Sequence, residues 1–237
     1  MTIQEFKNLP NSTESDQREI TRLFLEEYNS VPEFIELRTF VEENAFGFGE
    51  KVFYPFHRMI VEASPDYISF LEIGVFRGQT LVLVAMIAEM IGKDVSIYGV
   101  TPLDSTDGHW ESNYAEDVNI IHKKFDLPHP NIIKGLSTNH SVIHSCSDLE
   151  LDILYIDGGH TTEVVTSDII HYAPLVKKGG YMIIDDSANN INGAYWGEFW
   201  GVQPVSNVVD HLLPPKAENR EWEYIGNVIH NRVWRRI

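Results

Sequence analysis

A chain of 237 residues is long enough for one sizeable α/β domain with additions, and short for two domains. Hydrophobic residues make up 43% of the sequence, which is enough for a real core and argues against global disorder. The formal net charge of −17 would repel a long phosphate backbone, so we expect no nucleic acid among the partners. No apolar run approaches the roughly 20 residues that span a bilayer, so we expect no membrane partner.

Two further features bear on the compartment. The first residues, MTIQEFKNLPNSTESDQ, have neither the basic start nor the apolar core of a secretory signal. The one cysteine, Cys146, has no second cysteine in the chain with which to form a disulfide. Both observations favour a cytoplasmic protein.

The periodicity of apolar residues predicts helices first and then an alternation of strands and helices. Residues 15–46 are expected to be mainly helical, because apolar side chains recur at spacings of three and four, and 53–63 to form another helix. Strands are then expected at 67–75, 95–100, 131–135, 151–157 and 180–186, with helices at 79–92, 114–125 and 162–176. Near-continuous apolar strands interleaved with helices indicate a parallel sheet covered on both faces. The tail, 221–237, predicts two further strands that close one edge as an antiparallel pair.

In such sheets ligands bind beyond the carboxyl ends of the strands, so residues at these positions are the candidates. The first strand runs into LEIGVFRGQT (71–80), which offers Glu72, Gly74, Gly78 and Thr80. Glycines there let backbone approach a ligand, and the following helix presents free N–H groups to an anion. A dinucleotide fingerprint is poorly supported, because Phe76 occupies the place of its middle glycine. A glycine-bearing turn without a ligand is the alternative.

The segment 155–186, YIDGGHTTEVVTSDIIHYAPLVKKGGYMIIDD, adds a second motif. Together the two motifs resemble class I S-adenosylmethionine (SAM) methyltransferases, in a branch with macrolide-sugar O-methyltransferases and cephalosporin-hydroxylase-like proteins. The closing double aspartate also resembles catechol-type O-methyltransferases. The resemblance covers about 67–186 and implies a Rossmann-like, seven-stranded, mostly parallel sheet of order 3-2-1-4-5-7-6. We therefore expect a methyltransferase domain at 67–237, preceded by a helical segment at 1–66 that acts as a lid or a dimer contact.

The resemblance also implies a metal site. The metal-dependent relatives hold Mg²⁺ with acids that map to Asp157, Asp185 and Asp186, and such oxygen donors suit a hard octahedral cation. His160 stands where the relatives carry a general base, and an imidazole titrates close to neutral pH. Three carboxylates that converge without a cation should raise at least one of their pKa values.

Each of these residues also has a simpler interpretation. Asp157 could be only the acid that metal-free methyltransferases keep after the fourth strand. Asp185 and Asp186 could cap a turn. His160 could cap the helix that begins at Thr161 or Thr162.

The cofactor residues implied by the resemblance are Glu72, Gly74, Gly78, Thr80, Thr101, Leu136, Ser137 and Asp157. Thr101 departs from the pattern, because the relatives end the second strand with an acid that binds both ribose hydroxyls. A threonine cannot accept from both hydroxyls, so either Asp104 fills this role, or cofactor affinity is lower, or SAM is not used.

Some aromatic residues and histidines are weaker candidates. His109 and Trp110 could touch substrate, and an aromatic cluster after the double aspartate could form a substrate wall or lid: Tyr195, Trp196, Phe199 and Trp200. The other histidines, His57 and His230 among them, show no tight ligand spacing and are interpreted as structural or solvated.

The sequence therefore predicts a SAM- and Mg²⁺-dependent O-methyltransferase that acts on a hydroxyl of a small molecule, a sugar or glycoside rather than a catechol, with a homodimer as an option. Two alternatives stay open. One is a non-catalytic SAM-fold binding protein, favoured by Thr101. The other is an Fe²⁺-dependent, hydroxylase-like oxidoreductase that uses the three aspartates and His160.

Overall fold

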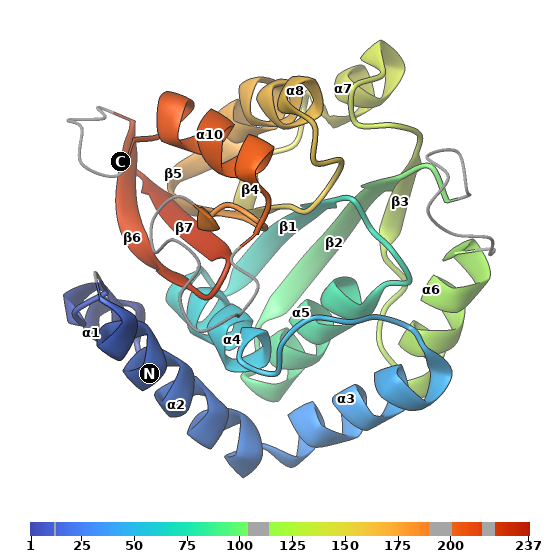
Figure 1. The fold of residues 1–237 in the computed structure, drawn as a ribbon. Coiled ribbons are helices and arrows are strands. Elements are labelled where there is room, and N and C mark those ends of the chain that lie inside the picture. Colours follow the sequence, from blue (N-terminus) through green and yellow to red (C-terminus); the bar gives the residue numbers. More distant parts are fainter. Residues whose placement is uncertain (12, 104–113, 190–200, 215–220) are drawn as a thin grey trace.

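The computed structural model describes residues 1–11, 13–103, 114–189, 201–214 and 221–237 (Figure 1). Several of the weaker candidates lie outside these described residues: Asp104, His109, Trp110, Tyr195, Trp196, Phe199 and Trp200.

A seven-stranded sheet of order β3-β2-β1-β4-β5-β7-β6 forms the centre of the molecule. The neighbouring pairs among β1 to β5 are parallel, whereas β7 runs antiparallel to both β5 and β6. The expected fold class and strand order are thus confirmed. The strands are β1 (Tyr67–Ile73), β2 (Asp94–Thr101), β3 (Asn131–Lys134), β4 (Leu151–Ile156), β5 (Val176–Ile184), β6 (Trp222–Val228) and β7 (Asn231–Arg236).

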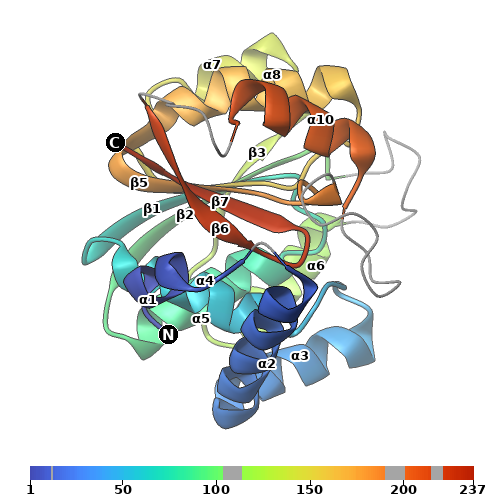
Figure 2. The same cartoon turned by 60° about the vertical axis from the view of Figure 1, so that its left-hand side comes forward.

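Helices cover both faces of the sheet (Figure 2). One face carries α7 (His140–Cys146), α8 (Thr162–Tyr172) and α10 (Gln203–Leu212). The other carries α1 (Ile3–Asn8), α2 (Glu14–Ser30), α3 (Pro32–Asn44), α4 (Phe53–Ala63), α5 (Gln79–Met90) and α6 (Tyr114–Lys124). Every residue of β4 is buried, because this central strand is covered on both sides.

The N-terminal helices share the core of the sheet. Phe6, Phe24 and Phe56, from α1, α2 and α4, meet edge to face with ring centroids 5.9 to 6.3 Å apart. Such pairs add to the free energy of apolar burial. This packing fixes α1 and α2 against α4, which itself packs on α5. A role of residues 1–66 as a lid or dimer contact stays a prediction.

The structure departs from the sequence-based expectation in a few elements. The helix expected at 162–176 ends at Tyr172 and continues as a short 3₁₀ turn at Ala173–Leu175, because Pro174 cannot donate a helical hydrogen bond. β5 begins at Val176 rather than at Gly180, and its register with β4 shifts between Leu151 and Ile153. Helices α7 and α10 were not predicted.

Among the described residues, no helix is both long enough and apolar enough to cross a bilayer.

A candidate active site at the carboxyl edge of the sheet

The carboxyl ends of the central strands meet at one edge, and backbone hydrogen bonds continue just past the strands. The amide of Gly74 donates to Val100 (2.9 Å), that of Asp157 donates to Ile73 (2.8 Å), and that of Asp185 donates to Ile156 (2.9 Å). The loops that follow β1, β4 and β5 therefore leave the sheet side by side. This places the candidate residues of both motifs around one point.

Glu72, near the end of β1, is almost completely buried, with 3% of its surface exposed. Burial raises its pKa to about 8; a hydrogen bond with Thr80 opposes the shift, and the charge of Asp185 adds to it. Its Oε2 atom has no hydrogen-bond partner among the described residues. An unpartnered buried carboxylate oxygen costs free energy, so this oxygen is a candidate to accept a hydrogen bond from a ligand.

The glycines of the first motif are required by the protein itself. A Cβ atom on Gly74 (φ +98°) would lie 2.0 Å from the carbonyl oxygen of Asp157, and one on Gly78 (φ +87°) would lie 3.1 Å from Val118 Cγ2. Both residues also have positive φ, which glycine adopts without strain. A side chain at Gly74 would displace the loop after β4, so this position cannot separate a loss of ligand from a loss of structure.

The remaining cofactor candidates lie further along the same edge. Thr101 ends β2, is 3% exposed, and its Oγ1 accepts a hydrogen bond from the Leu103 amide at 3.3 Å. Leu136 and Ser137 follow β3, and the side chain of Leu136 is 40% exposed. The structure thus brings the candidates of the first three strands to one edge.

The three aspartates predicted as metal ligands lie at the same edge, but among the described residues the group with ligand atoms within 4.8 Å of one another contains Asp185 and Asp186 and not Asp157. The carboxyl groups of Asp157 and Asp185 are close enough to form a side-chain hydrogen bond when one is protonated. Asp186 follows in a turn with φ +55°, a conformation that aspartate and asparagine adopt more readily than most other non-glycine residues. The turn conformation is therefore one reason for an aspartate at 186 that does not depend on a ligand.

The pKa values reflect this crowding. Burial, with the negative charge of Asp185 beside it, raises the pKa of Asp157 well above its usual range. Burial and the same neighbour raise the pKa of Asp186 to about 7. Burial alone would also raise the pKa of Asp185, but the hydrogen bond and charge of His230 outweigh it, so that pKa is lowered. The expectation of at least one raised pKa is confirmed, and a cation at this point would relieve the repulsion.

His160 lies at the rim of this cluster. Its Nε2 atom is 3.2 Å from Asp186 Oδ2, and 48% of its side chain is exposed. It does not cap α8, because Thr161 is the N-cap and its side chain accepts from the Val164 amide. The simpler interpretation of His160 as a helix cap is therefore wrong, and its imidazole lies beside the acids.

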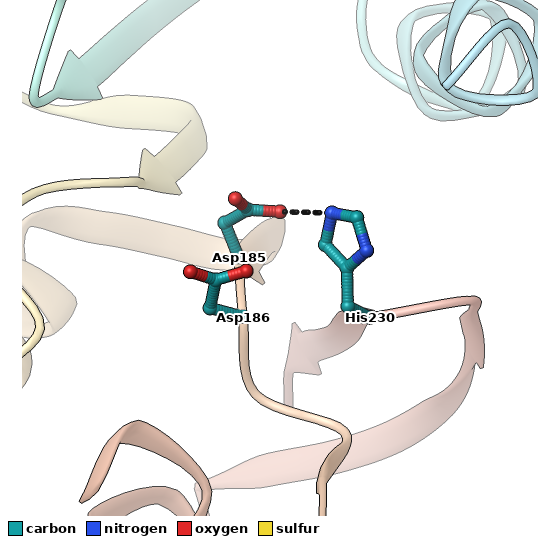
Figure 3. A group of neighbouring side chains, drawn as sticks. All are labelled: Asp185, Asp186 and His230. Atoms are coloured by element: carbon teal, nitrogen blue, oxygen red, sulfur yellow. Dashed lines mark ion pairs between the residues drawn. The ribbon is translucent and has the colours of Figure 1, made fainter. Parts of the chain in front are cut away.

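His230 is one residue that the sequence motifs did not assign to the site. It lies on the turn between β6 and β7, and its Nε2 is 3.3 Å from Asp185 Oδ1 (Figure 3). Burial lowers its pKa, but the hydrogen bond with Asp185 and the surrounding negative charges raise it more, to about 9. Ligand atoms of Asp185, Asp186 and His230 all lie within 4.8 Å of one another. The expectation of a solvated His230 is thus wrong, because the antiparallel hairpin buries it beside the acids.

Asp168 is a second missed residue. It lies on α8, is fully buried, and neither carboxylate oxygen has a hydrogen-bond partner among the described residues. Burial raises its pKa to about 6, against the opposing effect of the nearby Ser137 hydroxyl. A Cβ atom on Gly158 would lie 3.2 Å from Asp168 Oδ2, so this glycine leaves room for the carboxylate beneath the loop.

A small pocket opens beside the acids. It is lined by Asp157, Gly158, Gly159 and His160 from the loop after β4, by Asp185 after β5, and by Val165 of α8 and Val205 of α10. The loop after β4 thus forms one wall, and both predicted groups, the carboxylate and the imidazole, reach it.

The N-terminal segment contributes to the same region. Glu50, before α4, places Oε2 3.9 Å from His230 Nε2, and the Phe53 ring meets the His230 ring edge to face at 4.9 Å. Arg77, in the loop after β1, donates to the carbonyl of Ala45 at 2.9 Å. The segment before β1 therefore packs on the loops that form the site.

The strand order, the glycine-bearing loop after β1 and the acids after β4 and β5 define the class I methyltransferase fold. In agreement, residues 71–187 match a family described as "Methyltransferase domain". Residues 71–187 therefore form a methyltransferase domain, as the resemblance predicted.

Individual relatives are distant. An uncharacterized protein of Acanthamoeba polyphaga mimivirus is 29% identical over 200 residues, which cover 79% of this chain and 80% of that protein. The structure of a putative caffeoyl-CoA O-methyltransferase from Staphylococcus aureus superposes with a TM-score of 0.65 at 15% identity, over 91% of this chain and 97% of that one. The MycE methyltransferase of the mycinamycin biosynthetic pathway, in complex with Mg and SAH, superposes with a TM-score of 0.53 at 18% identity, over 86% of this chain and 54% of that one.

Proposed function

We propose that this protein transfers the methyl group of SAM to a hydroxyl group of a small molecule, with the help of a divalent cation. The observation that carries the proposal is that Asp157 and Asp186 both lie close enough to Asp185 at the carboxyl edge to feel its charge, beside the exposed imidazole of His160. Buried like charges are unfavourable unless a cation neutralises them.

The residues after β1 fit the amino-acid end of SAM. The buried Glu72 carboxylate, with its unpartnered Oε2, suits an ammonium group, and the first turn of α5 offers backbone N–H groups to a carboxylate. We assign the ribose to the region of Thr101 and the adenine to the loop that carries Leu136 and Ser137. Gly74, Gly78 and Thr80 shape the loop, and Asp157 borders both the cofactor and the metal.

Asp157, Asp185 and Asp186 would hold the cation, because oxygen ligands with open positions suit Mg²⁺ or a similar ion. When bound, SAM supplies an electrophilic methyl group, and the cation stabilises negative charge on the acceptor oxygen. The residues of the chain hold both partners in line, which lowers the barrier through proximity and orientation.

His160 takes the proton of the acceptor hydroxyl at an imidazole nitrogen. In this transfer the methyl group would pass from sulfur to oxygen, the sulfur would keep the electron pair of the broken bond, and the proton would end on His160. Asp186, 3.2 Å from Nε2, orients the ring and favours its protonated form after transfer.

For the acceptor we propose a sugar or glycoside. The support is the sequence pattern shared with macrolide-sugar methyltransferases and the fold shared with MycE, which is described in complex with Mg, SAH and mycinamycin VI. The packing of Glu50 and Phe53 against His230 supports a further role of residues 1–66 in covering the cofactor. Homodimer formation and a cytoplasmic location remain predictions.

An Fe²⁺-dependent oxidoreductase is the second candidate, because two imidazoles, His160 and His230, lie beside the acids. One assay separates the candidates. The full chain is incubated with methyl-labelled SAM and a panel of glycosides and catechols, with Mg²⁺, with Fe²⁺, or with a chelator. We expect label in a glycoside, SAH as co-product and loss of transfer with the chelator. Oxygen consumption with Fe²⁺ and no methyl transfer would support the oxidoreductase, and SAM binding without turnover would indicate a binding protein.

A further inference from the structure

His230 occupies a position that the sequence motifs do not assign. It sits on the turn between β6 and β7, 5% exposed, and its Nε2 lies 3.3 Å from Asp185 Oδ1. Figure 3 shows the ring directed at the Asp185 carboxylate, with the Asp186 carboxylate beside it. The ligand atoms of the three residues all lie within 4.8 Å of one another.

The turn is held firmly in this place. The carbonyl oxygen of His230 accepts a hydrogen bond from the Ser187 amide at 2.9 Å, and the neighbouring Asn231 donates from Nδ2 to Asp185 Oδ1 at 2.5 Å. The ring itself packs edge to face on Phe53. β7 pairs with β5 directly behind, so the hairpin and the double aspartate form one unit. The imidazole is therefore pre-positioned rather than free to rotate into solvent.

The spacing suits shared coordination. In octahedral coordination, two ligand atoms bound about 2.1 Å from one ion lie about 3.0 Å apart when adjacent and about 4.2 Å apart when opposite. The His230–Asp185 distance matches adjacent ligands after a small adjustment. Mg²⁺ prefers oxygen ligands only, whereas imidazole nitrogen suits first-row transition metals such as Fe²⁺, Zn²⁺ and Co²⁺, and a mixed site accepts Mn²⁺.

We propose that His230 is a direct ligand of the divalent cation, through Nε2, together with Asp185 and Asp186, and that it makes the site select a transition metal over Mg²⁺. This inference rests on the metal site of the proposed function. This ligand set differs from the three aspartates of the proposed function, because one of its ligand atoms is a nitrogen from the C-terminal hairpin. The competing arrangement is a protonated His230 that pairs with Asp185 and stays outside the coordination sphere.

Pulsed electron paramagnetic resonance of the Mn²⁺-loaded full chain distinguishes the two arrangements, because a coordinated imidazole nitrogen modulates the Mn²⁺ electron spin echo. We expect nitrogen modulation in the wild-type protein. We expect it to change when the chain is made with ¹⁵N-labelled histidine, a test that needs no substitution. His230→Gln should abolish it, while His160→Gln and the exposed-surface control His171→Gln should keep it.

Calorimetry on the same proteins measures the selectivity. His230→Gln should weaken Mn²⁺ and Co²⁺ binding by at least about tenfold, the lower end of the loss seen for groups that support a metal site. Mg²⁺ binding should change much less, so the preference for the transition metals falls.

Two results would overturn the inference while leaving the proposed metal site intact: Mn²⁺ that binds to wild-type protein without nitrogen modulation, or modulation lost in His160→Gln and kept in His230→Gln. A wild-type chain that binds no divalent cation would overturn both the inference and the metal part of the proposed function. A circular dichroism spectrum equal to that of wild type confirms that each variant is folded.

Discussion

Buried aspartates at the two edges of the sheet differ in whether their carboxylate oxygens have partners. At the amino edge, Asp152 at the start of β4 is 3% exposed and fully partnered. Its Oδ1 lies 2.6 Å from Lys177 Nζ, and its Oδ2 accepts from the Ser69 amide at 2.9 Å. A buried carboxylate with both oxygens satisfied contributes to structure alone.

Among the described residues of the carboxyl edge, the acids outnumber the positive groups beside them. Asp157, Asp185 and Asp186 crowd together, and two of the three have raised pKa values. Glu72 adds a further buried carboxylate with an unpartnered oxygen. Uncompensated buried charge is costly, so these acids would be stabilised by positively charged ligands. They therefore identify the carboxyl edge as the edge where ligands bind.

The largest expected effect comes from removing the central acid. Asp185→Ala should abolish divalent cation binding and lower turnover by more than the 10–100-fold typical of a supporting group at a metal site. SAM binding should remain, because Glu72 and the loop after β1 are untouched. Calorimetry with Mn²⁺ and with SAH checks both statements. The matched variant at the other edge, Asp152→Ala, should lower thermal stability yet keep cation binding; loss of cation binding there as well would remove the distinction between the edges.

His160→Ala should lower the methyl-transfer rate roughly 10²–10⁴-fold at neutral pH, the usual range for a general base. Metal and SAM affinities should stay near those of wild type, and part of the rate should return at high pH, where hydroxide takes the proton. His171→Ala, an exposed histidine on α8, is the control. Wild-type turnover in the His160 variant would exclude His160 as the general base.

Asp168→Asn should stabilise the protein, and more so at higher pH. Burial raises the pKa of Asp168 from 3.8 to about 6, so the folded state keeps this proton to higher pH than the unfolded state does. Stability is therefore lost as pH rises from about 4 to about 6, up to about 3 kcal/mol in total. Asparagine does not ionise, so the variant does not lose this stability as the pH rises. Melting temperatures at pH 5 and pH 8 measure it, with a larger gain expected at pH 8.

The paired control is Asp152→Asn, which loses its contact with Lys177 and should be less stable than wild type. A stabilised Asp152 variant, or an Asp168 variant that is destabilised equally at both pH values, would contradict the contrast between partnered and unpartnered acids.

The smallest expected effect concerns the ribose. Thr101→Asp restores the acid that relatives carry at the end of the second strand, and should tighten SAH binding by about 1 kcal/mol. Titration of both proteins with SAH measures it. Unchanged or weaker binding would mean that another group already fills this role.

The sequence predicted the sheet well, because apolar strands and their order follow from local patterns and from a motif resemblance. α10 could have been predicted as well, since Val205, Val208, Val209 and Leu212 recur at helical spacing after Pro204.

The site was predicted only where its residues follow a strand directly. His230 lies 45 positions after Asp185 in the sequence and reaches it through an antiparallel hairpin whose register no local pattern reveals. Asp168 was hidden for a different reason: a polar residue within a helix normally faces water, and only the packing under Gly158 shows that it does not.

The most direct test of the central claim is a calorimetric titration of the full chain with SAH in the presence of a chelator, followed by titration of the complex with Mn²⁺. We predict one SAH site per chain that needs no metal, and then one cation site that is absent in Asp185→Ala and present in Asp152→Asn. A chain that takes up neither SAH nor a cation would contradict the assignment of the carboxyl edge as a methyl-transfer site.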